Sequence, residues 1–388
     1  MKTAISIIIL SLLPVLSYLL PSSALAGTQQ YPLTVTDLAG RHVTLTHRPS
    51  RVFLGQPRFF YAIMSLTPRP MDQLAGWNYP LSRIDPEIAP ALIKAWPSLA
   101  QLPALNAAPS PHISGEGLIA LKPDLVVLPL NQKSAIEGST LARVMRSMQI
   151  PWIYVDFDQY PLRDPIKSIS LLGNVLGYEK RAAQITQTIA HQQRLIATRV
   201  AHLKHRPSVF INITPGVKTQ CCRTNIRTGM DNIVSAAGGR NMAHNIPSDK
   251  ATLLSNEWIL GHPTDVVINT ARMNNAQRGI HLGPGASEGE IQQKLVELTH
   301  DMPGWTTLPA VKDKRFYVIW HGLHQGPYAV IDLMQIAKWL HPSTFSDISP
   351  MATFKTLLGP AAPVLGSGIY WGSLAPARES HYLGKPST

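Results

Sequence analysis

Continuous apolar runs of five or six residues, set between polar loops, recur along most of this chain. Runs of this kind are typical of strands that are buried on both faces of a sheet. They cover residues 124–128, 151–156, 208–213, 264–269 and 315–320. Because stretches of helical composition lie between them, the pattern predicts an α/β protein with parallel strands.

The first part of the pattern differs, because its two runs alternate between apolar and polar residues. Residues 33–37 and 42–45 alternate on either side of a turn that contains Gly40, which predicts a β-hairpin. A short strand over residues 51–54 and a helix over residues 58–66 follow.

Four further helices are predicted from apolar spacing and from signals at their ends. One begins near Ser114, although the third position, where a capping box would place Glu, holds Gly117. The others cover residues 230–237, 255–260 and 328–339. The first of these three ends at a pair of glycines, a common stop signal for a helix.

A long amphipathic stretch in the middle of the chain stands apart from both halves. Apolar residues recur at helical spacing from Ile166 to Leu176, pause at Gly177, and continue from Ala182 to Leu203. The second part exceeds 20 residues and contains neither Gly nor Pro, although the chain as a whole has 26 Gly and 33 Pro residues. We expect a stiff connector between two lobes, with one more domain helix as the alternative.

The first residues indicate an export signal. Lys2 precedes an apolar stretch over residues 4–20 and a small-residue ending at Ala24-Leu25-Ala26. This predicts a secretory signal peptide that is cleaved after Ala26, with a retained membrane anchor as the alternative. No cysteine follows the cleavage site, so the sequence pattern of a bacterial lipid anchor is missing. We therefore expect a soluble protein of the periplasm.

Composition and charge narrow the possible functions. Hydrophobic residues make up 45% and charged residues 15% of the chain, which fits a packed globular protein. The formal net charge is +12, but Lys and Arg are scattered rather than gathered in a block. This disfavours nucleic-acid binding and favours a basic pocket for an anionic ligand. The two cysteines, Cys221 and Cys222, are neighbours, and their state stays open between a strained disulfide and two thiols.

Two segments share one plan and introduce a wider likeness. "EGLIALKPDLVVLPL" and "EWILGHPTDVVINT" both place a Glu and an apolar helix before Pro, Asp and a strand. With further segments, they make the chain resemble class III periplasmic substrate-binding proteins of ABC importers, which receive ferric siderophores, haem, cobalamin and metal ions. The further segments are "TDLAGRHVTL", "PIKSISLLGNVLG", "GMDNIVSAAGGRNMA", "PGWTTLPAVKDKRFYVIW" and "GSGIYWGSL". The resemblance covers residues 31–374.

The resemblance implies an α/β fold of two lobes of mixed α/β (Rossmann-like) structure, joined by one long rigid helix, with the ligand cleft between the lobes. It implies small closure motions, no enzyme activity and no cofactor of the protein's own. The implied partners are an inner-membrane ABC permease, its ATPase and a small-molecule metal chelate, with the protein acting as a monomer. Family members dock on the permease through an acidic residue on each lobe, for which Glu87 and Asp231 are the possible counterparts.

The expected domain boundaries follow from the signal peptide, the connector and the extent of the family resemblance. They are residues 1–26 for the signal peptide, 27–163 for the N-terminal lobe, 164–204 for the connecting backbone helix, 205–374 for the C-terminal lobe and 375–388 for a flexible tail.

In open α/β sheets the ligand lies beyond the carboxyl ends of the strands, which selects the loops that follow them. These loops are rich in arginine, aromatic residues, amides and histidine, and Asp158 is their only acid. The arginines can bind an anion through paired hydrogen bonds, and the aromatic rings can stack on a flat chelator. The candidate ligand-binding residues are Arg58, Trp77, Asn78, Tyr79, Tyr160, Arg223, Arg227, Arg272, His321, His324 and Tyr328.

His321 and His324 follow the last predicted strand in a loop that contains glycine. Helical metalloprotease pairs have the form HExxH, with histidines four residues apart, so this pair does not match them. We interpret the pair as lining of the cleft, with either imidazole as the metal ligand if the bound species offers a metal.

The predicted function is the capture of an iron chelate, an anionic ferric siderophore, for an ABC importer. Alternatives within the same fold are a metal oxyanion such as molybdate, or a free metal ion or haem held by His321 or His324. A periplasmic metalloenzyme is a distant third.

Overall fold

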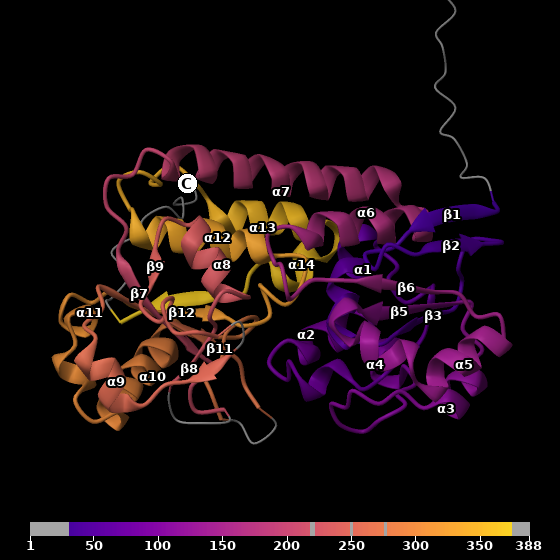
Figure 1. The fold of residues 1–388 in the computed structure, drawn as a ribbon, viewed down its shortest axis with the longest axis horizontal. Helices are drawn as coiled ribbons and strands as arrows, with labels where there is room; N and C mark the ends of the chain where they lie inside the picture. The colour runs from indigo at the N-terminus through magenta and orange to yellow at the C-terminus, as the bar shows by residue number, and fades with distance from the viewer. Residues whose placement is uncertain (1–30, 218–221, 249–250, 275–277, 375–388) are drawn as a thin grey trace, which may run out of the picture. The chain divides into compact units, whose positions relative to one another are not determined.

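The computed structural model describes residues 31–217, 222–248, 251–274 and 278–374. The predicted signal peptide, the predicted tail after residue 374 and Cys221 lie outside these ranges. The described chain has the predicted α/β architecture of two lobes, each built on one main β-sheet (Figure 1). Within the described ranges, none of the helices is both long and apolar enough to span a membrane.

The sheet of the N-terminal lobe has four parallel strands in the order β4–β3–β5–β6. The strands are β3 (Val52–Leu54), β4 (Leu74–Trp77), β5 (Leu125–Pro129) and β6 (Trp152–Val155), and the helices are α1 (Phe60–Leu66), α2 (Ala89–Ala95), α3 (Gly115–Leu121), α4 (Lys133–Glu137) and α5 (Thr140–Ser147). Every residue of β3 and β5 is buried, so continuous apolar runs do mark strands covered on both faces. Ser114 caps α3, because its hydroxyl accepts a hydrogen bond from the backbone N–H of Gly117 at 3.2 Å.

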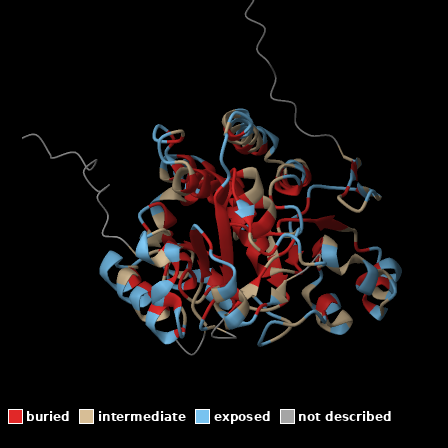
Figure 2. Cartoon of the chain, turned by 60° about the vertical axis from the view of Figure 1, so that its left-hand side comes forward, coloured by how far each residue is buried: buried red, intermediate tan, exposed pale blue. Residues whose placement is uncertain are grey.

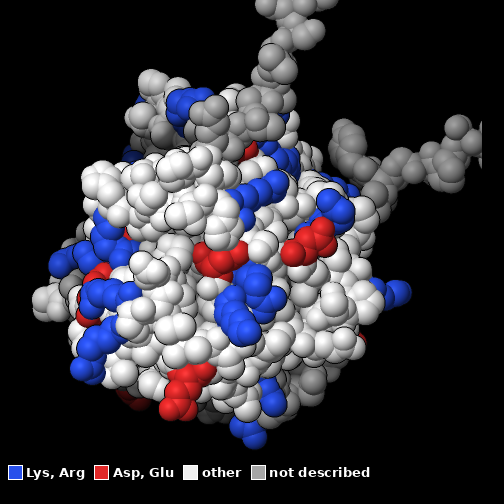
Figure 3. Space-filling view, turned by 90° about the vertical axis from the view of Figure 1, so that its right-hand side faces the viewer, with Lys and Arg blue, Asp and Glu red and all other residues white. Residues whose placement is uncertain are grey.

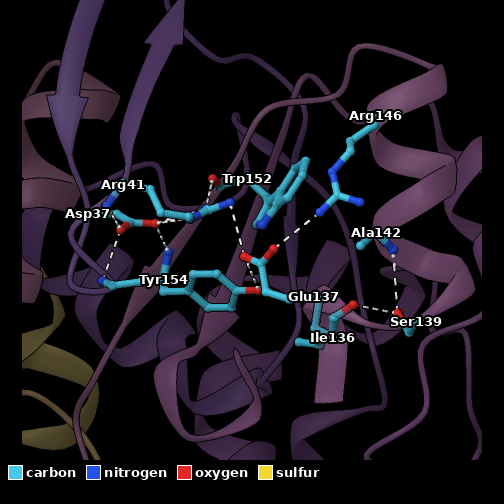
Figure 4. A network of polar contacts seen from close by, with 10 residues as sticks. Asp37, Arg41, Ile136, Glu137, Ser139, Ala142, Arg146, Trp152 and Tyr154 are labelled. Carbon is cyan, nitrogen blue, oxygen red and sulfur yellow. Dashed lines mark hydrogen bonds and ion pairs between the residues drawn. The ribbon is translucent and has the colours of Figure 1, made fainter. Parts of the chain in front are cut away.

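The predicted hairpin is present and lies against the outer edge of this sheet. Its strands β1 (Leu33–Thr36) and β2 (His42–Leu45) pair antiparallel. Arg41, in the turn, pairs with Asp37 at 2.8 Å and donates a hydrogen bond to the Trp152 carbonyl at 2.6 Å. Glu137 of α4 lies 3.5 Å from the same guanidinium (Figure 4). These contacts attach the hairpin to the first residue of β6.

The mid-chain connector consists of two helices. α6 (Asp164–Leu176) ends at Gly177, whose positive φ of 77° suits glycine, and α7 (Glu179–Val200) follows. Figure 1 shows α7 extending over both lobes. The two helices approach closely at Gly173, where a Cβ atom would lie 2.2 Å from the Cβ atom of Ala182. Residues 201–204, which were expected to continue the connector, lie beyond the end of α7.

The sheet of the C-terminal lobe has the strand order β13–β12–β11–β7–β9, in which only β13 runs antiparallel to its neighbour. The strands are β7 (Ser208–Ile213), β9 (Arg240–Asn241), β11 (Val266–Ala271), β12 (Phe316–Trp320) and β13 (Trp371–Ser373). The helices are α8 (Met230–Ala236), α9 (Asn256–Gly261), α10 (Glu288–Asp301), α11 (Pro309–Lys312), α12 (Ala329–Leu340), α13 (Pro350–Leu358) and α14 (Ala362–Leu365). The three predicted strands form the centre of the sheet, whereas its two short edge strands and α10 had no clear sequence signal.

One hydrophobic core is continuous between the lobes at the base of the cleft. It joins residues of β3 and α1 to residues of β12 and α12. Tyr61 of α1 packs edge-on against Trp320 of β12, with ring centroids 5.7 Å apart. Figure 2 shows buried residues concentrated in the strands and in the helices packed against them. The lobes are therefore held together at this base by packed side chains as well as by the connector.

Candidate functional site

A cavity of about 690 Å³ lies between the two lobes. Its N-terminal wall is formed by residues after β3, β5 and β6, and its C-terminal wall by residues after β7, β11 and β12. Seven of the predicted ligand-binding residues line it, namely Arg58, Tyr160, Arg223, Arg227, Arg272, His321 and His324. The cavity is therefore located where parallel α/β sheets place their ligands, at the carboxyl ends of the strands.

A two-stranded ribbon, absent from the sequence prediction, forms part of the C-terminal wall. It pairs β8 (Arg223–Thr224) with β10 (Thr252–Leu253). The segment "CRTNIR", residues 222–227, places fully buried side chains at its first, third and fifth positions. The other three residues of the segment, two arginines and an asparagine, alternate with them and line the cavity. Alternation of buried and polar residues with a period of two indicates a strand, although the sequence prediction treated this segment as a loop.

Cys222 is the first residue of that segment. It is fully buried and disulfide-bonded, so the question left open by the sequence resolves in favour of a disulfide on this residue.

Arg58 is buried at the junction of the lobes and its charge is already paired. Its Nε and Nη2 atoms donate hydrogen bonds to the two carboxylate oxygens of Asp85 at 2.8 and 2.6 Å, and the Tyr61 hydroxyl donates to the same carboxylate at 2.7 Å. Its Nη1 atom donates to the side chain of Gln325 from the other lobe. Gln325 in turn donates to Asp158 at 3.3 Å. Arg58 therefore organises the floor of the cavity and adds little net charge to it.

The remaining arginines give the cavity its positive charge. Arg272 reaches across to the carbonyl of Ile84 at 3.1 Å, and burial, together with the charge of Arg58, lowers its pKa. Arg223 is half-buried on the ribbon, and Arg227 is exposed beside it. Among the described residues that line the cavity, the only carboxylate is that of Asp158, whose pKa is raised by burial and by nearby Asp156. Positive charge therefore exceeds negative charge around this space.

His321 and His324 are buried in this positive surrounding and are neutral near pH 7. Burial lowers the pKa of His321 well below its ordinary value, and the charges of Arg58 and Arg272 add to the effect. Burial and the charge of Arg58 lower the pKa of His324 to about 3. The rings meet edge to face with centroids 4.6 Å apart.

The two imidazoles differ in the hydrogen bonding of their Nδ1 atoms. His321 Nδ1 lies 3.0 Å from the hydroxyl of Thr270, whereas the buried Nδ1 atom of His324 has no hydrogen-bond partner among the described residues. A neutral ring nitrogen of this kind can accept a hydrogen bond from a ligand or bind a metal. No group of three or more His, Cys, Asp or Glu side chains in the described part of the chain is arranged to hold a metal ion.

Four residues predicted to face the ligand lie outside this cavity. Trp77 is the last residue of β4 and is buried in the lobe core, and the Asn78 amide donates a hydrogen bond to the Ser110 carbonyl at 2.7 Å. Tyr79 is half-buried against the core. Tyr328 is fully buried, and its hydroxyl lies 2.7 Å from that of Ser65 on the N-terminal lobe. Their side chains therefore stabilise the lobes and the contact between them.

The two predicted docking acids are also buried, which is the opposite of what a docking contact requires. Glu87 accepts hydrogen bonds from Nε1 of Trp320 at 2.9 Å and from the backbone N–H of Met273 at 3.3 Å, both on the other lobe. Burial raises its pKa to about 8, and the charge of Asp85 adds to the shift. Asp231 is 1% exposed and accepts a hydrogen bond from a backbone N–H of its own lobe. Glu87 is thus a bridge between the lobes.

The face at the outer end of the N-terminal lobe carries charges of both signs (Figure 3). Figure 3, which views the N-terminal lobe from its end, shows Lys and Arg side chains interspersed with acidic ones and with large uncharged areas. This face agrees with the prediction that positive residues are scattered.

Comparisons with known proteins give one consistent result. A family model described as "Periplasmic binding protein" matches residues 85–321. YvrC of Bacillus subtilis (strain 168), an uncharacterized ABC transporter substrate-binding lipoprotein, is 23% identical over 332 residues, which are 84% of this chain and 91% of YvrC. The structure of the TroA-like periplasmic binding protein FepB from Veillonella parvula aligns with a TM-score of 0.80 and 24% identity, over 89% of this chain and 100% of FepB. The structure of the Haemophilus influenzae molybdate periplasmic binding protein MolA, with molybdate bound, aligns with a TM-score of 0.63 and 15% identity, over 87% of this chain and 99% of MolA.

Proposed function

This chain belongs to the periplasmic binding protein family, and from that membership we propose that it captures an anionic iron chelate, of the ferric siderophore class, between its lobes. Members of the family are substrate-binding components of ABC transporters and not enzymes, so the bound species is cargo rather than a cofactor. The protein acts in the periplasm and delivers its ligand to an inner-membrane permease and ATPase.

The excess of arginine over carboxylate in the interlobe cavity is the observation that carries this proposal. Within the described part of the chain, Asp158 is the only lining carboxylate that offsets Arg223, Arg227 and Arg272, because Asp85 is already paired with Arg58. In a partly desolvated space, such charges favour an anion and repel a bare cation. The two histidines add no charge, since burial keeps them neutral.

The size of the cavity supports an organic chelate over a small oxyanion. Its volume of about 690 Å³ lies within the roughly 300–1,000 Å³ typical of pockets for organic ligands. A tetrahedral oxyanion would leave most of this space to water. The molybdate of MolA is therefore a less suitable model for the ligand of this chain than a larger complex.

Haem or another open metal complex is the second candidate, and the unpartnered Nδ1 atom of His324 favours it. A neutral imidazole at the cavity wall can complete the coordination of a metal that a chelator leaves unsaturated. His324→Gln separates the two readings, because it would abolish tight binding of haem and alter a saturated chelate little.

We further propose that the protein is a soluble monomer, released by cleavage after Ala26 without a lipid anchor. The B. subtilis relative is described as a lipoprotein, so the point requires a direct measurement. The intact mass of the protein exported to the periplasm tests it, since a lipid chain adds a discrete mass.

Calorimetric titration of the purified protein tests the ligand class. The panel contains the iron(III) complex of a hexadentate tricatecholamide, tris(oxalato)ferrate(III), molybdate, haem and Ni²⁺. We expect the anionic iron complexes to bind, and Arg223→Ala and Arg272→Ala each to weaken them about tenfold or more, because each removes a charge-assisted hydrogen bond. Arg143→Ala is the control, since Arg143 is exposed on α5 and lines no part of the cavity. Tighter binding of molybdate or Ni²⁺, or chelate affinity unchanged in both variants, would refute the proposal.

A further inference from the structure

The ribbon β8–β10 carries one large apolar side chain, Leu253, on the same face as Arg223, next to but outside the residues that line the cavity. Arg223, on β8, and Ala251, just before β10, both line the cavity. Leu253 is two residues after Ala251, so its side chain projects from the same face of the strand. Leu253 is also the cross-strand partner of Arg223, and such partners share one face of a ribbon. The cross-strand pairing therefore places Leu253 beside Arg223, on the face of the ribbon from which Arg223 reaches the cavity.

Leu253 is unusual for its exposure. It is 62% exposed, the highest value among the large hydrophobic side chains of the described residues. Its neighbours in the strand order, Thr252 and Leu254, point to the other face, where Leu254 is buried. Leu254 thus packs into the lobe, whereas Leu253 projects from the opposite, solvent-exposed face of the ribbon, which it shares with Arg223.

The N-terminal lobe presents a matching side chain at the same cavity. Tyr160 lines the cavity and is 46% exposed. The guanidinium carbon of Arg163 lies 3.9 Å from the centre of its ring, and Arg163 is itself paired with Asp164 at 2.7 Å. This stack fixes the orientation of the ring, so its exposed surface is available for binding without further ordering.

We propose that Leu253 and Tyr160 determine specificity by contacting an apolar, ring-bearing periphery of the bound chelate. The inference rests on the proposed function and narrows it to anionic chelates with aromatic rims. Arg223 and Arg272 hold the charged core, while Leu253 and Tyr160 cover the rim from opposite lobes. A chelate without rings would leave both side chains in water, and it would lose the hydrophobic gain that their burial provides.

Two iron(III) complexes of equal charge test the inference. Both carry a threefold negative charge, but the tricatecholamide complex is edged by aromatic rings and tris(oxalato)ferrate(III) has none. We expect the wild-type protein to bind the ring-bearing complex more tightly. Leu253→Ser and Tyr160→Ser should each weaken that complex about tenfold and leave the oxalate complex unchanged. Val296→Ser is the matched control, because Val296 is an exposed apolar residue on α10, a helix that contributes no residue to the cavity lining.

Each remaining outcome counts against the inference in a recognisable way. If wild type binds both complexes equally, and Leu253→Ser changes neither, the rim contact is wrong while the proposed anion binding stands. If Leu253→Ser weakens both complexes alike, its effect is structural. If it leaves both affinities intact but reduces ligand-dependent ATPase activity of the importer, the residue contacts the permease instead. If wild type binds neither complex, the proposed function fails and the inference fails with it.

Discussion

Glu87 offers the sharpest test of how the lobes are held together. Its carboxylate is buried and accepts two hydrogen bonds from the C-terminal lobe. The titratable groups that face it are Asp85, Arg58, Arg272 and Tyr61. Burial, with the charge of Asp85 added, raises its pKa from 4.5 to about 8. The folded protein therefore holds a proton that the unfolded chain releases above about pH 4.5.

The sign of the pH dependence follows from that difference in bound protons. Between pH 4.5 and 8 the folded state binds more protons, so the free energy of unfolding falls as the pH rises. The slope is at most about 1.4 kcal/mol per pH unit, which gives about 4 kcal/mol between pH 5 and pH 8 as an upper bound. Glu87→Gln removes this contribution because an amide does not titrate.

The substitution also costs one hydrogen bond. The glutamine oxygen can accept one of the two N–H groups, but its amide nitrogen cannot accept the other, at a cost of about 1 kcal/mol. At pH 5 we therefore expect Glu87→Gln to be less stable than wild type by about 1 kcal/mol. At pH 8 we expect it to be more stable by up to about 3 kcal/mol, so that the two curves cross.

Urea unfolding, followed by tryptophan fluorescence at pH 5, 6, 7 and 8, measures the difference directly. Glu116→Gln serves as the control, because Glu116 is an exposed carboxylate on α3. The reasoning is refuted if the stability difference between wild type and Glu87→Gln stays constant across this range.

Two further predictions concern the interior. Asp332 on α12 is fully buried, neither carboxylate oxygen has a hydrogen-bond partner among the described residues, and burial raises its pKa well above its ordinary value. Asp332→Asn should therefore raise the urea midpoint at pH 7.5, with a smaller gain at pH 5, and a lower midpoint at both values would contradict this. Gly173→Ala should lower the free energy of unfolding by about 1–3 kcal/mol, because its new methyl group would overlap that of Ala182. Thermal unfolding measures this, and Ala182→Gly in the same chain should restore part of the loss.

Much of the secondary structure was predictable because its signals are local. The buried strands β5, β7 and β12 each form one apolar run, and a run of this length records burial on both faces without reference to the rest of the fold. The break between α6 and α7 was visible at Gly177 for the same reason. The strand β4 was missed because Gly76 interrupts its apolar run, and that glycine is required by the approach of the Pro103 carbonyl.

The residues of the candidate site could be predicted wherever the preceding strand had been predicted correctly. Knowing that β11 and β12 end at Ala271 and Trp320 is enough to direct Arg272, His321 and His324 towards the cleft. The same rule failed at Trp77, which belongs to the missed strand β4 and turns into the core.

The amino-acid pattern thus decided which segments become strands and helices and which loops collect arginine and histidine, because period, capping and burial depend on neighbours in the chain. The tertiary structure alone decided what those side chains do. Asp85 neutralises Arg58 from 27 residues away, and Trp320 meets Glu87 from 233 residues away. Charge pairing and desolvation depend on distance in space, and distances of this kind are set only when the two lobes pack against each other.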